Sequence, residues 1–160
     1  MYEMGLEIER KFLVKDTSFK QESFKKVYLK QGFLNSDRRR IVRIRITDES
    51  AYLTVKGISN ASGTTRFEWE KEISKTDAEE LMLLCEPGII EKYRHYIRLG
   101  KHIFEVDEFL GENEGLILAE VELSSENEVF ETPSFLGIEV TGNEKYYNSN
   151  ISKKPYQYWE

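Results

Sequence analysis

Hydrophobic and polar residues alternate along most of the chain. The pattern begins at Leu6-Glu7-Ile8-Glu9 and recurs in nine segments, at about residues 4–14, 27–34, 39–48, 51–58, 64–73, 89–99, 102–110, 117–124 and 136–141. Alternate residues of a strand share a face, so each segment is predicted to be a strand with one apolar and one polar face. Short connections such as Gly100-Lys101 favour antiparallel pairing, with closure into a barrel as one arrangement.

Shorter segments between these strands predict helices. The chain has 160 residues and no repeat or linker, which suits a single domain, 1–160. We expect an α+β protein that is mainly antiparallel β. Capping-box spacings predict two helices, one beginning at Thr76 with Glu79 and a shorter one at Ser125 with Glu128, and two more are predicted at residues 16–26 and 143–150.

The polar faces of several strands carry doublets of like charge, for example Glu7 with Glu9 and Arg43 with Arg45. A solvated sheet face would explain any single strand. Like charges two residues apart lie about 6.6 Å from each other and gain nothing in the free protein. The whole set is therefore better explained by a barrel with a polar lumen, an apolar exterior covered by helices, and a ligand that neutralises both kinds of charge.

The residue types on these faces indicate the ligand. Arginine binds phosphate oxygens bidentately, and carboxylates tolerate a nearby phosphate when Mg²⁺ or Mn²⁺ bridges the two. Both kinds of side chain in one cavity predict a complex of a divalent metal with a phosphate chain. The basic candidates are Lys11, Arg43, Arg45, Lys56, Arg66, Lys92 and Arg94, and the acidic candidates are Glu7, Glu9, Glu68, Glu70, Glu105, Asp107, Glu120 and Glu122.

Composition and charge narrow the classes of function. A net charge of −6 disfavours general nucleic-acid binding. No apolar run approaches the length of a membrane span, and no P-loop motif is present. Cys85 is the only cysteine, so no intrachain disulfide can form, and a cytoplasmic location is expected.

The ordered set of motifs resembles the CYTH domain, the triphosphate tunnel metalloenzyme superfamily. E-I-E-R-K at 7–11 has the E-x-E-x-K spacing of that family. It is followed, in the order of the family, by Q-G-F-L (31–34), R-I-R (43–45), T-V-K (54–56), R-F-E-W-E (66–70), K-Y-R (92–94), F-E-V-D (104–107) and A-E-V-E-L (119–123). The tail G-I-E-V-T-G-N-E-K-Y-Y-N resembles the ending of the family. The resemblance implies an eight-stranded closed antiparallel β-barrel with flanking helices, a divalent metal and a triphosphate substrate.

The resemblance also implies roles for individual residues. The seven basic candidates would grip phosphate oxygens, and Lys11, Lys92 and Tyr28 are the catalytic candidates. Tyr28 is expected either to reach the lumen or to be an ordinary core or surface tyrosine. Glu139 and Thr141 are expected either to line the lumen or to lie outside it. The main metal ligands would be Glu7, Glu9, Glu120 and Glu122, with Glu68, Glu70, Glu105 and Asp107 completing a second metal site or orienting water.

The short chain and its E-I-E-R-K-F-L-V start look like the bacterial subfamily that hydrolyses inorganic tripolyphosphate. Three alternatives stay open: a class IV-type adenylate cyclase, a thiamine or nucleoside triphosphatase, and a non-catalytic module that binds polyphosphate. No base-binding residues can be identified for the cyclase, and the principal glutamates are all present, which weighs against a degraded binding module. The sequence does not choose between Mg²⁺ and Mn²⁺ or between monomer and homodimer.

Overall fold

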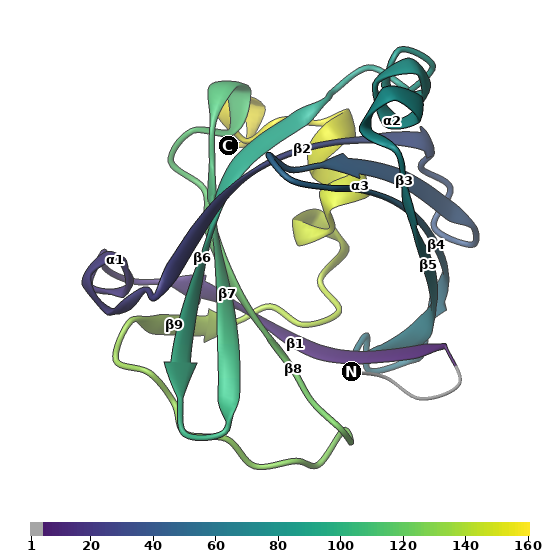
Figure 1. Ribbon diagram of the computed structural model, residues 1–160. Helices are drawn as coiled ribbons and strands as arrows, with labels where there is room; N and C mark the ends of the chain where they lie inside the picture. Colours follow the sequence, from purple (N-terminus) through teal and green to yellow (C-terminus); the bar gives the residue numbers. More distant parts are fainter. Residues whose placement is uncertain (1–4) are drawn as a thin grey trace.

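The computed structural model describes residues 5–160, in which nine strands form one antiparallel sheet. Eight of them follow the order β5-β4-β3-β2-β6-β7-β8-β1, and β1 also pairs with β5, so the sheet closes into a barrel (Figure 1). All nine predicted strands are found, although residue 4, the predicted start of the first, lies outside the described residues. The strands are β1 (Leu6–Val14), β2 (Lys25–Asn35), β3 (Ile41–Ile46), β4 (Ala51–Ser59), β5 (Thr65–Ile73), β6 (Ile90–Leu99), β7 (His102–Phe109), β8 (Ile117–Glu122) and β9 (Leu136–Glu139).

Strand β1 closes the barrel because successive parts of it pair with different neighbours. Residues 6–8 pair with β5, and residues 9–13 pair with β8. The end of β1 also pairs with β9, which adds a ninth strand outside the ring. The ring therefore has eight strands, as the resemblance implied.

Helices are few and short. The α-helices are α1 (Phe19–Glu22), α2 (Lys75–Met82) and α3 (Asn148–Lys153), and the 3₁₀ helices are η1 (Gly111–Asn113), η2 (Glu144–Tyr146) and η3 (Tyr156–Tyr158). The helices predicted around residue 76 and at 143–150 are present, the second as η2 followed by α3. Within the described residues, no helix is long and apolar enough to cross a membrane.

Three details of the predicted helices are wrong. Ser74, and not Thr76, caps α2, because its side chain accepts a hydrogen bond from the backbone N–H of Asp77. The helix predicted at 16–26 shrinks to four residues, since the chain from Lys25 onward joins β2. No helix forms at 125–128, where the carboxylate of Glu128 instead accepts from the backbone N–H of Ser124.

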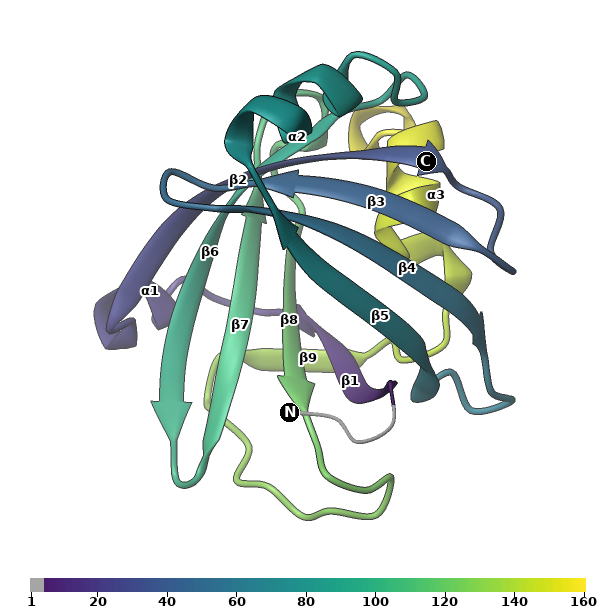
Figure 2. The ribbon, with the colours of Figure 1, turned by 45° about the vertical axis from the view of Figure 1, so that its right-hand side comes forward.

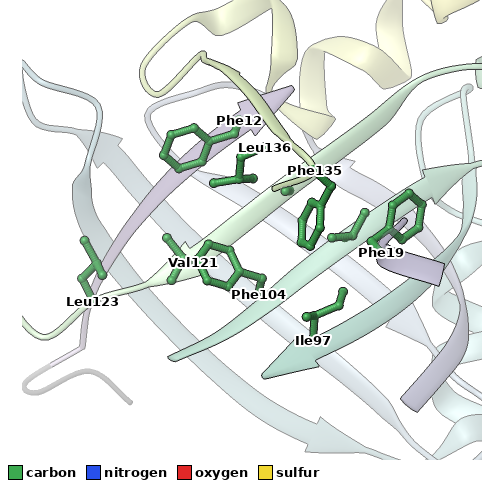
Figure 3. Packing of buried hydrophobic residues seen from close by; sticks show 10 residues of the cluster. Phe12, Phe19, Ile97, Phe104, Val121, Leu123, Phe135 and Leu136 are labelled. Atoms are coloured by element: carbon green, nitrogen blue, oxygen red, sulfur yellow. The ribbon is translucent and has the colours of Figure 1, made fainter. Parts of the chain in front are cut away.

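Apolar side chains form three clusters in the described part of the chain, two outside the barrel and one inside. The first lies on the outer face of β1 and β6–β8, where α1 and the segment around Phe135 cover it (Figure 3). The second lies between α2 and the outer face of β3 and β4, around Ile44. The helices and the 130–139 segment thus cover part of the apolar exterior, as the alternation predicted.

The third cluster fills one end of the barrel interior. It consists of Phe33, Ile41, Ile90, Phe109, Leu116 and Leu118, and it packs against Ile151 of α3. The C-terminal segment that carries α3, yellow in Figure 1 and Figure 2, lies across this end of the barrel. One end of the barrel is therefore closed by an apolar plug, and the charged residues occupy the remaining interior.

Candidate active site

The barrel encloses a cavity of about 530 Å³ whose walls are mostly charged. All eight strands of the ring contribute side chains to it. The lining includes every basic candidate and seven of the eight acidic candidates. These are Lys11, Arg43, Arg45, Lys56, Arg66, Lys92 and Arg94, and Glu7, Glu9, Glu68, Glu70, Glu105, Glu120 and Glu122.

Strand register decides which charges meet inside this cavity. Opposite charges face each other where Glu7 pairs with Arg66, Lys11 with Glu120, and Lys56 with Glu68. Like charges face each other at two places on neighbouring strands, namely Glu9 with Glu122 and Glu105 with Glu120. The carboxylates thus concentrate on β1, β7 and β8, where they outnumber their cationic partners.

Ion pairs hold much of the cavity wall in place. The Nζ of Lys56 lies 3.2 Å from the carboxylate of Glu7 and 3.4 Å from that of Glu68. The Nζ of Lys11 lies 3.4 Å from the carboxylate of Glu120. Lys56 and Arg66 lower the pKa of Glu7 to about 2, although its burial acts in the opposite direction. Glu7 is therefore ionised at neutral pH.

Arg43 lines the cavity with unused hydrogen-bonding capacity. One Nη donates to the hydroxyl of Thr54 at 3.1 Å and lies 3.6 Å from the carboxylate of Glu70, but the buried Nε has no partner among residues 5–160. Burial, and then the nearby Arg45, lowers the pKa of Arg43 to about 9. A buried guanidinium with an unpartnered N–H is stabilised by an anion that accepts a hydrogen bond from it.

The acidic side of the cavity carries an excess of negative charge. Burial, followed by Glu120 and Glu7, raises the pKa of Glu9 well above its ordinary value. A set of carboxylates that repel one another is the donor set that Mg²⁺ or Mn²⁺ prefers, so the residues present fit a divalent cation. Within residues 5–160 the carboxylates are not already gathered into a group of three that could hold a metal.

Asp107 is the one acidic candidate that does not line the cavity. Its carboxylate accepts from Nε and Nη2 of Arg94 at 2.8 and 2.9 Å, and it lies 2.7 Å from the Nζ of Lys92. These two cations hold its pKa well below the usual range against the effect of burial. Both oxygens of Asp107 are thus engaged by the cations of β6.

Tyr28 also lies away from the cavity. Its hydroxyl donates to the carboxylate of Glu91, and its ring packs against Tyr93 at 5.8 Å on the outer face of the sheet. The inward residues of β2 are instead Gln31 and its alternate neighbours. The structure thus places Tyr28 away from the cavity, in the position of an ordinary surface tyrosine.

Glu139 and Thr141 lie outside the barrel as well, where Glu139 pairs with Arg10 at 2.7 Å and accepts from the hydroxyl of Thr141. Neither residue lines the cavity.

The C-terminal segment supplies cavity residues that the strand pattern did not identify. Tyr147, which precedes α3, and Asn148 and Ser149, which begin it, line the cavity. The ring of Tyr147 lies 5.7 Å from the Nζ of Lys11 and 5.5 Å from the guanidinium carbon of Arg66. The only signal in the sequence was the K-Y-Y-N tail, because a short helix after the last strand has no alternation that would show its inward face.

Known proteins match nearly the whole length of the chain. Residues 5–158 match the family model for the CYTH domain. An inorganic triphosphatase of Acetivibrio thermocellus is 46% identical over 155 residues, which are 96% of this chain and 97% of that protein. An inorganic triphosphatase of Nitrosomonas europaea is 35% identical over 91% of this chain and 96% of its own length. The crystal structure of the inorganic triphosphatase NE1496 superposes with a TM-score of 0.65, at 32% identity, covering 91% of this chain and 93% of that one.

Proposed function

The chain belongs to the CYTH domain family, and from this premise we propose that it is a divalent-metal-dependent triphosphatase. Its favoured substrate is inorganic tripolyphosphate, and its products are pyrophosphate and orthophosphate. The two similar inorganic triphosphatases, which match nearly the whole chain, support this reaction.

One observation carries the proposal: all seven basic candidates and seven carboxylate side chains line a single cavity. A phosphate chain alone would be repelled by the carboxylates, and a metal alone would be repelled by the cations. A complex of the two neutralises both sets, because metal ions bridge carboxylate and phosphate oxygens. The seven cations are therefore proposed to contact the phosphate chain.

The mechanism assigns separate tasks to the two sides of the cavity. Glu7, Glu9, Glu120 and Glu122 would hold the metal, with Glu68, Glu70 and Glu105 near a second site or its waters. When bound, the metal supplies a water of lowered pKa and charge neutralisation at the phosphate. Arg43 and the other cations orient the chain and stabilise the charge that develops on the equatorial oxygens. Lys11 and Lys92 are the catalytic candidates on this side.

Phosphate release tests the proposal most simply. Tripolyphosphate, ATP and thiamine triphosphate are each incubated with Mg²⁺, Mn²⁺ or EDTA, and orthophosphate, pyrophosphate and cyclic AMP are measured. We expect the fastest turnover with tripolyphosphate and a divalent metal, with equal amounts of orthophosphate and pyrophosphate and none of either in EDTA. Undiminished hydrolysis in EDTA would refute the metal, and cyclic AMP without orthophosphate from ATP would establish the cyclase instead.

Location and assembly are predictions from the sequence. A cytoplasmic location is proposed, with a small-molecule substrate and neither nucleic acid nor a membrane as partner. The choice between monomer and homodimer is open, and light scattering of the purified protein decides it.

A further inference from the structure

We propose that Asn148 is a positioning residue of the active site, which holds Lys92 in the orientation that binds the phosphate chain and acts on Arg45 through Gln31. The inference rests on the proposed function, because it assumes that the phosphate chain occupies the cavity. It assigns a task to the C-terminal segment beyond closing one end of the barrel.

The side-chain oxygen of Asn148 is shared by two donors. It accepts from the Nζ of Lys92 at 2.8 Å and from the Nε2 of Gln31 at 2.9 Å. An ammonium has only donors, so the atom that it contacts has to be the amide oxygen, and this fixes the orientation of the Asn148 side chain. Asn148 itself lines the cavity.

These contacts determine where the Lys92 ammonium points. Lys92 is 1% exposed, and its Nζ contacts the carboxylate of Asp107 at 2.7 Å as well as Asn148. A lysine ammonium has three N–H groups, and two acceptors in fixed positions leave one direction for the third. Because Lys92 lines the cavity, that third N–H is available to a phosphate oxygen.

Gln31 extends the network to a second cation. It is fully buried, and its Oε1 accepts from the Nε of Arg45 at 3.4 Å while its Nε2 donates to Asn148. Hydrogen bonds thus run from Arg45 through Gln31 and Asn148 to Lys92. Cations held in advance lose little free energy to reorganisation when the charged substrate arrives. Asn148 stands at the centre of this arrangement.

If Asn148 had only a structural role, its loss should affect the enzyme no more than the loss of another asparagine of α3. Asn150 provides this matched control. Asn150 lies two residues further along α3, and its Nδ2 donates to the backbone carbonyl of Glu144 at 2.7 Å. That hydrogen bond joins two parts of the C-terminal segment, and Asn150 does not line the cavity. Alanine at either position removes one amide from the same helix, but only the Asn148 variant disturbs a cation of the cavity.

The test is a double-mutant cycle with Lys92. Asn148→Ala and Asn150→Ala are made in the wild type and in Lys92→Ala. Each protein is assayed for tripolyphosphate hydrolysis with Mg²⁺ and for tripolyphosphate binding by calorimetry with Ca²⁺ in place of Mg²⁺, so that a divalent cation accompanies the phosphate chain. We expect Asn148→Ala to lower kcat/KM about 10- to 100-fold, since small misplacements of a binding group have effects of this order. Asn150→Ala should stay within about 2-fold of the wild type, with a similar Tm for both variants.

The decisive result is the coupling between Asn148 and Lys92 in tripolyphosphate binding. A residue that acts mainly through Lys92 loses most of its effect on tripolyphosphate binding once Lys92 is alanine. An equal loss in both backgrounds would overturn the proposal, as would wild-type kcat/KM and affinity in Asn148→Ala. If the wild type binds tripolyphosphate but hydrolyses none, the proposed reaction fails while the binding cycle still decides the role of Asn148; if it does not bind, both proposals fail.

Discussion

Replacing Glu9 by glutamine is expected to stabilise the metal-free protein while abolishing metal-dependent turnover. Folding raises the pKa of Glu9 through burial and through the nearby carboxylates of Glu120 and Glu7. Glutamine keeps the shape of the side chain and removes its charge, so this unfavourable interaction disappears. The same change removes an anionic metal ligand, and we therefore expect a more stable but inactive protein.

The structure bounds the gain in the free energy of unfolding. Glu7 and Glu9 lie two positions apart on β1, which is about 6.6 Å along a strand. Two unit charges at that distance repel by about 2.5 kcal/mol at an effective dielectric constant of about 20. Lys11 and Lys56 offset part of this repulsion. The cost at pH 7 cannot exceed the free energy of protonating an ordinary carboxyl group at that pH, about 3.4 kcal/mol, because Glu9 can instead bind a proton. The expected gain is about 1 to 3 kcal/mol.

The gain in the free energy of unfolding should depend on pH. A carboxyl group whose pKa is raised by folding destabilises the folded state only where the unfolded chain has lost the proton, above its ordinary pKa of 4.5. The difference between the Glu9→Gln variant and the wild type should therefore be small near about pH 4 and grow as the pH rises toward about 7.5. Urea denaturation in EDTA at both pH values measures it, and a variant less stable than the wild type at the higher pH would refute the reasoning.

Two further substitutions test placements in the barrel. Tyr28→Phe should leave kcat/KM within about 2-fold of the wild type, because the hydroxyl of Tyr28 contacts Glu91 outside the barrel; a large loss in a steady-state assay would show that this residue acts in catalysis after all. Asp107→Asn should lower the free energy of unfolding by about 3 to 5 kcal/mol, because it leaves the buried charges of Arg94 and Lys92 without their carboxylate. Urea denaturation measures this loss, and an unchanged midpoint would contradict the buried ion pair.

Alternation alone predicted the strands and the cationic lining, because in most strands only one face is charged. The pattern gives two faces without saying which is inside, and β2 shows the consequence. Two of its inward residues, Gln31 and Phe33, carry no charge, and Phe33 belongs to the apolar cluster that packs against α3. Its polar face, with Tyr28, turns outward. The sequence left both faces open for Tyr28, and the structure places it on the outer one.

The sequence also did not show which inward residues reach the cavity and which are covered by other side chains. Glu105 and Asp107 lie on the same face of β7, yet Glu105 lines the cavity while Asp107 is covered by its ion pairs with Arg94 and Lys92. Only the register of β6 against β7, which places Arg94 opposite Asp107, distinguishes the two. Asn148 was missed for a related reason, since the docking of a C-terminal helix depends on tertiary contacts and not on strand periodicity.

The central claim is that one cavity holds a divalent cation on its acidic side and a phosphate chain on its basic side. Anomalous diffraction from crystals soaked with Mn²⁺ and tripolyphosphate tests it directly. We predict a manganese peak in contact with carboxylates among Glu9, Glu120 and Glu122, with phosphate density reaching Arg43 and Lys92. Manganese and phosphate bound only at the outer surface, with the cavity holding water alone, would contradict the account.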